Sequence, residues 1–114
     1  MSHDQEQNDL NMLLEKLSAQ LGEPVLKSSQ RLLILIMLKV NGRMRFYELQ
    51  STLGIGKGSL SNHIDKLEEN DLVKVRDVLT VTGPGKSLEL TSKGKEIVGE
   101  YSEIMRIIFD NGKL

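Results

Sequence analysis

Two short amphipathic segments joined by a glycine-containing turn constrain the fold of this chain more than any other feature. Residues 46–53 and residues 58–69 each place apolar side chains on one helical face. These are Leu49 and Leu53 in the first segment, and Leu60, Ile64 and Leu67 in the second. Between them, Gly54 can take the positive φ that a helix end favours, and Ile55 can fill the corner. We therefore predict two helices joined by a tight turn at residues 54–57.

The opposite face of the second segment carries short hydrogen-bonding side chains and one cation. These residues are Ser59, Ser61, Asn62 and Lys66. Hydroxyl and amide groups suit base edges, and a cation suits phosphate. A helix-turn-helix can hold such a face out from a domain for insertion into a major groove. On these two segments alone, an ordinary helical hairpin with a solvated polar face explains the pattern equally well.

The residues that follow predict a β-hairpin. Residues 71–76 alternate apolar and charged side chains, as a half-buried strand does, and residues 78–82 continue in β-favouring types. The Gly-Pro-Gly-Lys run at 83–86 is a turn signal, and residues 87–90 alternate again. We expect Lys86 to lie at the tip of this hairpin. A helix-turn-helix followed directly by a hairpin is the winged-helix arrangement.

At this point the chain resembles the winged helix-turn-helix domain of the MarR and ArsR groups of prokaryotic transcriptional regulators. The resemblance covers residues 31–94. It is carried by Phe46-x-x-Leu49-x-x-x-Leu53-Gly54-Ile55, Gly58-Ser59-Leu60-Ser61-x-His63-Ile64-x-x-Leu67, Asp71-Leu72-Val73 and Leu90-Thr91-x-x-Gly94. It implies a DNA-binding homodimer that uses its second motif helix and its wing. The DNA-binding residues we then expect are Lys57, Ser59, Ser61, Asn62, Lys66 and Lys86.

Composition limits the other chemistry of the chain. Its 114 residues include no Cys, which excludes disulfides, thiolate metal sites and Cys nucleophiles, and fits a reducing cytoplasm. The Cys motif of metal-sensing ArsR members is therefore missing, and we expect no metal or other cofactor. His63 is the only His outside the N-terminal tail, and we expect it to be a hydrogen-bonded packing residue. With no base beside Ser59 or Ser61, we expect no enzyme.

The charges of the chain are unevenly distributed. Residues 25–93 hold eleven cations and seven acids, giving +4. Residues 1–24 hold one cation and five acids, giving −4, and residues 94–114 hold three cations and four acids, giving −1. The positive excess thus falls on the winged segment, where phosphates would lie. The longest apolar run has seven residues, 32–38, so we expect no membrane span.

We interpret residues 1–114 as one mainly α-helical domain with a small β-hairpin. The winged body spans about 28–94, and helices at about 9–21 and 92–109 flank it. The nearly continuous apolar run makes the helix at about 29–40 the expected buried centre. A short extended piece at residues 43–45 is expected to pair with the wing, Thr91 to cap the last helix, and the tails 1–8 and 110–114 to be loose.

Each flanking helix carries an apolar stripe with steps of four, three and four residues. The stripes are Leu10, Leu14, Leu17 and Leu21 in the first, and Ile97, Tyr101, Ile104 and Ile108 in the last. We do not expect one small body to cover both stripes fully, so we predict that they build a homodimer with two reading helices. The alternative is that both helices wrap their own body.

The sequence leaves two functions open. The first is a sequence-specific regulator that binds double-stranded DNA as a homodimer, favoured by the polar second helix and the positive middle segment. The second is a winged-helix protein-interaction module without DNA binding, favoured by the pI of 6.1 and a wing with few basic residues. No residue marks a pocket for a small-molecule effector.

Overall fold

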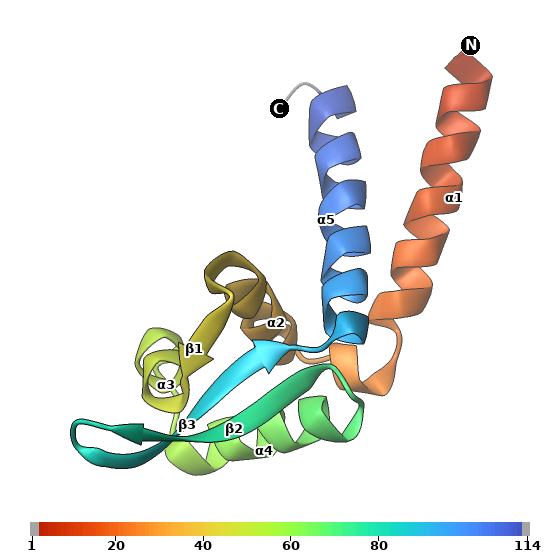
Figure 1. Cartoon of the computed structure of the whole chain (residues 1–114). Coiled ribbons are helices and arrows are strands. Elements are labelled where there is room, and N and C mark those ends of the chain that lie inside the picture. Colours follow the sequence, from red (N-terminus) through yellow and green to blue (C-terminus); the bar gives the residue numbers. More distant parts are fainter. Residues whose placement is uncertain (1–2, 113–114) are drawn as a thin grey trace.

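The computed structural model describes residues 3–112 as a helical body with a small sheet and two projecting helices (Figure 1). The elements are α1 (His3–Leu21), the 3-10 helix η1 (Pro24–Leu26), α2 (Ser29–Asn41), β1 (Arg43–Arg45), α3 (Phe46–Leu53), α4 (Lys57–Glu69), β2 (Val73–Thr80), β3 (Gly83–Leu90) and α5 (Ser92–Gly112). The expected fold class, mainly α with a winged helix-turn-helix, is confirmed. The molecule is elongated, with a long axis of 60 Å against 25 Å in the other two directions.

Helix α2 lies at the centre of the body, as its apolar run predicted. Ile34, Leu35 and Leu38 are at most 1% exposed, and the helix contacts α4, α5 and β3. Its burial is one-sided, however, because Leu33 is 44% exposed and Val40 is 76% exposed. The prediction of a buried centre is therefore confirmed for one face of α2, whereas Leu33 and Val40 leave apolar surface on this helix accessible.

The helix-turn-helix forms as the periodicity predicted. Helix α3 has the predicted bounds, and α4 begins at Lys57, one residue earlier than expected. Gly54 ends α3 with a φ of 65°, a conformation that glycine adopts without a steric penalty. Ile55 is half-buried and packs against the core, filling the corner between the helices. Three leucines, Leu49, Leu60 and Leu67, anchor the pair at 0% exposure.

The antiparallel sheet has the strand order β1-β3-β2, so residues 43–45 do pair with the wing. Thr80 lies opposite Gly83, which leaves Val81 and Thr82 as the hairpin connection. The prediction of a turn at 83–86 was therefore wrong. These residues belong to β3, where Gly83 takes a φ of 119°. Pro84 is tolerated because β1 pairs with β3 only as far as Ser87, leaving one side of β3 free.

Both flanking helices are longer than the sequence predicted. Helix α1 begins at His3 and α5 runs to Gly112, so the described parts of the supposedly loose tails are helical. Side chains one turn apart support the extensions, with Gln7 bonded to Asn11 and Arg106 to Asp110. Thr91 caps α5 as expected, since its Oγ1 accepts from the Gly94 amide at 3.0 Å. Within residues 3–112, no helix is both long and apolar enough to cross a bilayer.

Candidate nucleic-acid interface

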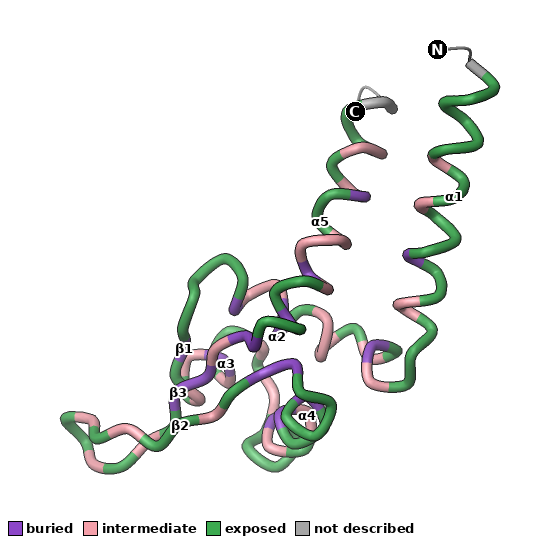
Figure 2. Tube along the Cα trace, turned by 45° about the vertical axis from the view of Figure 1, so that its right-hand side comes forward, coloured by how far each residue is buried: buried purple, intermediate pink, exposed green. Residues whose placement is uncertain are grey.

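The exposed face of α4 carries the polar residues that the sequence singled out. Ser59, Asn62 and Lys66 are exposed, while the opposite face of the helix is fixed in the core. Figure 2 shows this division along α4, with buried and exposed segments alternating around the helix. Ser61 is half-buried and turns toward the wing rather than straight outward. The structure therefore places three of the expected reading residues on one accessible surface, with Ser61 at its edge.

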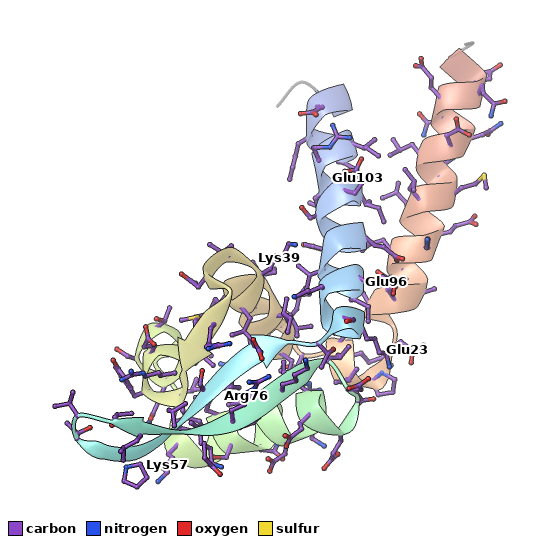
Figure 3. The ribbon with its side chains drawn as sticks, viewed as in Figure 1. Glu23, Lys39, Lys57, Arg76, Glu96 and Glu103 are labelled. Carbon is purple, nitrogen blue, oxygen red and sulfur yellow. The ribbon has the colours of Figure 1, made fainter. Side chains whose placement is uncertain are left out.

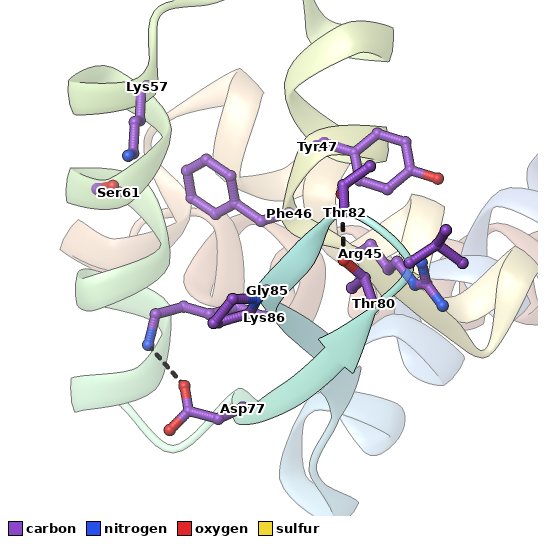
Figure 4. Close-up of a pocket in the computed structure, with 12 residues that line it drawn as sticks. Arg45, Phe46, Tyr47, Lys57, Ser61, Asp77, Thr80, Thr82, Gly85 and Lys86 are labelled. Carbon is purple, nitrogen blue, oxygen red and sulfur yellow. Dashed lines mark hydrogen bonds and ion pairs between the residues drawn. The ribbon is translucent and has the colours of Figure 1, made fainter.

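A groove of about 840 Å³ separates the wing from the start of the helix-turn-helix (Figure 4). Helix α4 contributes Lys57 and Ser61 to it, and α3 contributes Phe46 and Tyr47. The wing supplies the facing wall, including Lys86. Cations thus stand on both sides of a largely apolar channel that opens beside the polar face of α4. Lys57 and Lys86, on opposite walls of the channel, can each contact a phosphate of a bound duplex, while the apolar lining contributes nothing to phosphate binding.

Lys86 is not at the tip of the wing, contrary to the prediction. It lies opposite Asp77 in the β2–β3 ladder, and its Nζ is 3.2 Å from Asp77 Oδ1. Because the two side chains are 58% and 91% exposed, this ion pair is worth at most about 1 kcal/mol. Lys86 can therefore exchange Asp77 for a phosphate at little cost. The tip instead exposes two apolar side chains, Leu79 at 87% and Val81 at 104% exposure, beside the hydroxyls of Thr80 and Thr82.

The open face of the sheet adds basic residues that the sequence reasoning missed. Arg43 and Arg76 both approach Glu89, at 3.3 and 3.2 Å (Figure 3 labels Arg76). The hydrogen bond from Arg43, followed by the charges nearby, holds the pKa of Glu89 below its usual value. Arg45 and the 62%-exposed Tyr47 at the groove were also missed. The available signal was the Arg-Met-Arg run before α3, whose alternation places both arginines on one face.

His63 is a hydrogen-bonded packing residue, as expected. Its Nε2 is 2.9 Å from Gln30 Oε1, and its Nδ1 is 3.2 Å from Arg31 Nη1. Burial, followed by the charges of Arg31 and Lys66, lowers the pKa of His63. Both ring nitrogens are therefore occupied. Among the residues that the structure describes, no group of three or more His, Asp or Glu side chains could hold a metal ion.

Helices α1 and α5, which carry the apolar stripes, lie side by side within one chain (Figure 1). Leu17 is 9% exposed and Ile104 is 2% exposed, and Gln20 and Lys16 both approach Glu100. The other stripe residues are less covered: Leu14 is 39% exposed, and Leu10, Leu21, Ile97, Tyr101 and Ile108 are half-buried. Met12 and Phe109 add exposed apolar surface nearby, at 66% and 47%. Part of the expected interface is thus an internal seam, and part stays accessible.

The fold and this surface together define a winged helix-turn-helix domain. The family model described as "Winged helix DNA-binding domain" matches residues 30–109. The chain therefore belongs to this family, and the predicted resemblance to MarR-like regulators is confirmed at the level of the fold. A comparison with curated proteins found no match.

Solved structures agree with this assignment. A transcriptional regulator homologue from Pyrococcus horikoshii OT3 is 30% identical, with a TM-score of 0.67, over 90% of this chain and 99% of that one. A putative MarR-family regulator from Porphyromonas gingivalis W83 is 22% identical, with a TM-score of 0.60 and coverages of 79% and 85%. A mutant MarR from E. coli, complexed with operator DNA, is 16% identical, with a TM-score of 0.58 and coverages of 92% and 74%. The last two show likeness of fold alone.

Proposed function

We propose that this protein is a sequence-specific regulator that binds double-stranded DNA as a homodimer, with α4 in the major groove. The proposal rests on one observation: α4 has an apolar face that is buried in the core and a polar face that is exposed. Leu60, Ile64 and Leu67 fix the helix in the core, so Asn62 and Lys66 must face outward. A rigidly held helix with an accessible amide and cation has what direct base reading requires.

The charge and shape around α4 support the same proposal. Lys57 at the start of α4 and Lys86 on the wing flank the groove, where they can contact consecutive phosphates. The winged segment carries the positive excess of the chain, while both flanking segments are negative. The E. coli MarR mutant with the same fold is complexed with operator DNA. These features favour a specific footprint over general coating of nucleic acid.

The homodimer rests on apolar surface that the chain leaves uncovered. Met12 and Leu14 belong to α1 and Phe109 to α5, the two helices that project from the body (Figure 1), and all three side chains are exposed. Full burial of one such side chain contributes roughly 1.5–3 kcal/mol, and a two-fold interface buries each residue twice. A two-fold axis would also present two α4 helices to one face of the duplex, about 34 Å apart or a multiple of that distance.

A second candidate is a winged-helix module that docks proteins and does not bind DNA. The exposed Leu79 and Val81 at the wing tip favour it, because apolar side chains add nothing to phosphate binding. Selection of bound duplexes from a random pool separates the two candidates. A recovered palindrome supports a DNA-reading dimer. No enrichment, combined with no retention of any duplex at low salt, would reject DNA binding and favour the docking module.

A further inference from the structure

The Arg31 side chain joins three elements at the edge of the reading helix. From α2 it reaches back to η1, where Nε donates to the Val25 carbonyl at 2.6 Å and Nη2 to the Pro24 carbonyl at 3.2 Å. Its third nitrogen, Nη1, is 3.2 Å from His63 Nδ1 in the middle of α4. One guanidinium therefore ties the α1–α2 connection to the helix that carries Ser59 and Asn62.

The chemistry of the partners fixes where the imidazole proton lies. A guanidinium can only donate hydrogen bonds, so Nδ1 of His63 must be the bare, accepting nitrogen. The proton of the neutral ring is then on Nε2, which donates to Gln30 Oε1 at 2.9 Å. A protonated ring would carry a hydrogen on Nδ1 as well, facing the hydrogens of Arg31. These hydrogen bonds are therefore compatible only with the neutral Nε2–H tautomer of His63.

We propose that Arg31 and His63 form a clamp that positions α4 for DNA reading and that closes only while the His63 ring is neutral. The inference deepens the proposed function and rests on it. His63 is adjacent to Asn62 and one turn from Ser59, so a change at the ring is passed to both reading side chains through the helix backbone. Arg31 and His63 act here as positioning residues and do not touch the DNA.

The charged surroundings of the ring give the clamp its pH dependence. Arg31 comes from α2 and Lys66 from α4 itself, while Gln30 is neutral and η1 presents only carbonyls, to Arg31. Burial and these two cations depress the pKa of the folded His63 below its usual 6.5. The unfolded ring therefore binds protons first on acidification. The stabilisation from the clamp is therefore fully present above about pH 6.5, the usual pKa of the ring, and is lost as the pH falls through the lower pKa of the folded ring.

Two substitutions at position 63 distinguish the effect of the hydrogen bonds from the effect of side-chain volume. In His63→Gln, the amide oxygen can accept from Arg31 and the amide nitrogen can donate to Gln30, with nothing to titrate. In His63→Phe, the ring volume stays but both hydrogen bonds are lost. Each protein is titrated with a duplex carrying the selected site and with a scrambled duplex, between pH 5 and pH 8 at constant ionic strength. The specificity ratio is the affinity for the first duplex divided by that for the second.

We expect the specificity ratio of the unmodified protein to fall about fivefold as the His63 ring becomes protonated below pH 6.5, the effect of losing about one hydrogen bond. His63→Gln should keep a high ratio throughout, and His63→Phe a low ratio throughout. A ratio for the unmodified protein that stays flat over the pH range in which the chemical shifts show the ring becoming protonated would overturn the clamp. The same conclusion would follow if His63→Gln showed the pH dependence of the unmodified protein.

A measurement without DNA distinguishes failure of the clamp from failure of the proposed function. In a His3→Gln background, His63 is the only imidazole, and its nitrogen chemical shifts report tautomer and charge. We expect the Nε2–H tautomer at pH 8, and backbone amide shifts of Ser59 and Asn62 that follow the ring titration. His63→Gln should abolish that movement. An Nδ1–H tautomer at pH 8 would reject the clamp even if the protein binds DNA. Amide shifts of Ser59 and Asn62 that stay constant while the ring titrates would reject it as well.

Discussion

Replacing Gly94 by Ala tests the contact that sets α5 against the base of the wing. A methyl group at this position would lie 2.2 Å from the Leu72 carbonyl oxygen and 3.3 Å from Leu90 Cδ2. The carbonyl cannot simply withdraw, because it accepts a hydrogen bond from the Thr91 amide at 3.1 Å. The chain must therefore separate the first turn of α5 from the end of the helix-turn-helix to make room.

The expected cost combines three effects. Overpacking a well-filled site costs about 1–3 kcal/mol, and losing the bond to Thr91 costs about 0.5–1.5 kcal/mol. The higher helix propensity of Ala offsets this by about 1 kcal/mol. We expect Gly94→Ala to lower the free energy of unfolding by about 0.5–3.5 kcal/mol, a decrease in Tm of roughly 2–14 °C for a domain of this size.

A matched control lies five residues further along the same helix. A methyl group at Gly99 would meet nothing within 4 Å, so Gly99→Ala should be neutral or raise stability by up to about 1 kcal/mol. Urea unfolding of both variants, followed by far-UV circular dichroism at one protein concentration, measures the difference. If Gly94→Ala proved as stable as Gly99→Ala, the close approach of α5 to Leu72 would be refuted.

Three further predictions concern the interface and the assembly. Asn62→Ala should weaken binding to the selected site by about 1–3 kcal/mol through loss of a bidentate adenine contact. Binding competition with the scrambled duplex checks it, since equal loss on both duplexes would show that Asn62 does not read bases. Lys86→Ala should lower the slope of log affinity against log salt concentration by about one per subunit. Asp77→Asn should strengthen binding to every duplex, because it removes the ion-pair partner of Lys86. An unchanged slope in a salt titration of Lys86→Ala would show that this side chain does not contact a phosphate. Leu14→Asp should give a folded monomer, because Leu14 is 39% exposed whereas Leu17 is buried in the α1–α5 seam. Analytical ultracentrifugation measures the oligomeric state of both proteins. If the unmodified protein were already a monomer at tens of micromolar, the proposed dimer would be contradicted.

The sequence determined the helix-turn-helix almost completely. Apolar residues at steps of three and four specify which face of α4 is buried, and Gly54 marks the end of α3 by its tolerance of positive φ. These signals act over one or two turns of helix, so they can be recognised without knowing which other element packs against the helix. The polar residues opposite Leu60 and Ile64 followed from the same geometry, and with them the position of the candidate reading surface.

The wing shows where local signals fail. A Gly-Pro-Gly run favours a turn, yet the tertiary register places it in β3. That register pairs Val73 with Leu90 and Val75 with Leu88, so apolar side chains from both strands meet the core, and the connection falls at Val81 and Thr82. Burial of these apolar pairs at the base of the two strands outweighs the turn preference of three residues, because a slipped register would remove the pairs from the core.

Tertiary structure alone decided the contacts that join distant parts of the chain. The sequence indicated that His63 would be hydrogen-bonded, but its partners Gln30 and Arg31 lie 33 and 32 residues away and leave no periodic trace. The apolar stripes of α1 and α5 were likewise visible, but not that Leu17 and Ile104 would be buried within one chain. A periodic pattern reports which face of an element is apolar. Which other element covers that face depends on how the whole chain packs, and only the folded structure specifies it.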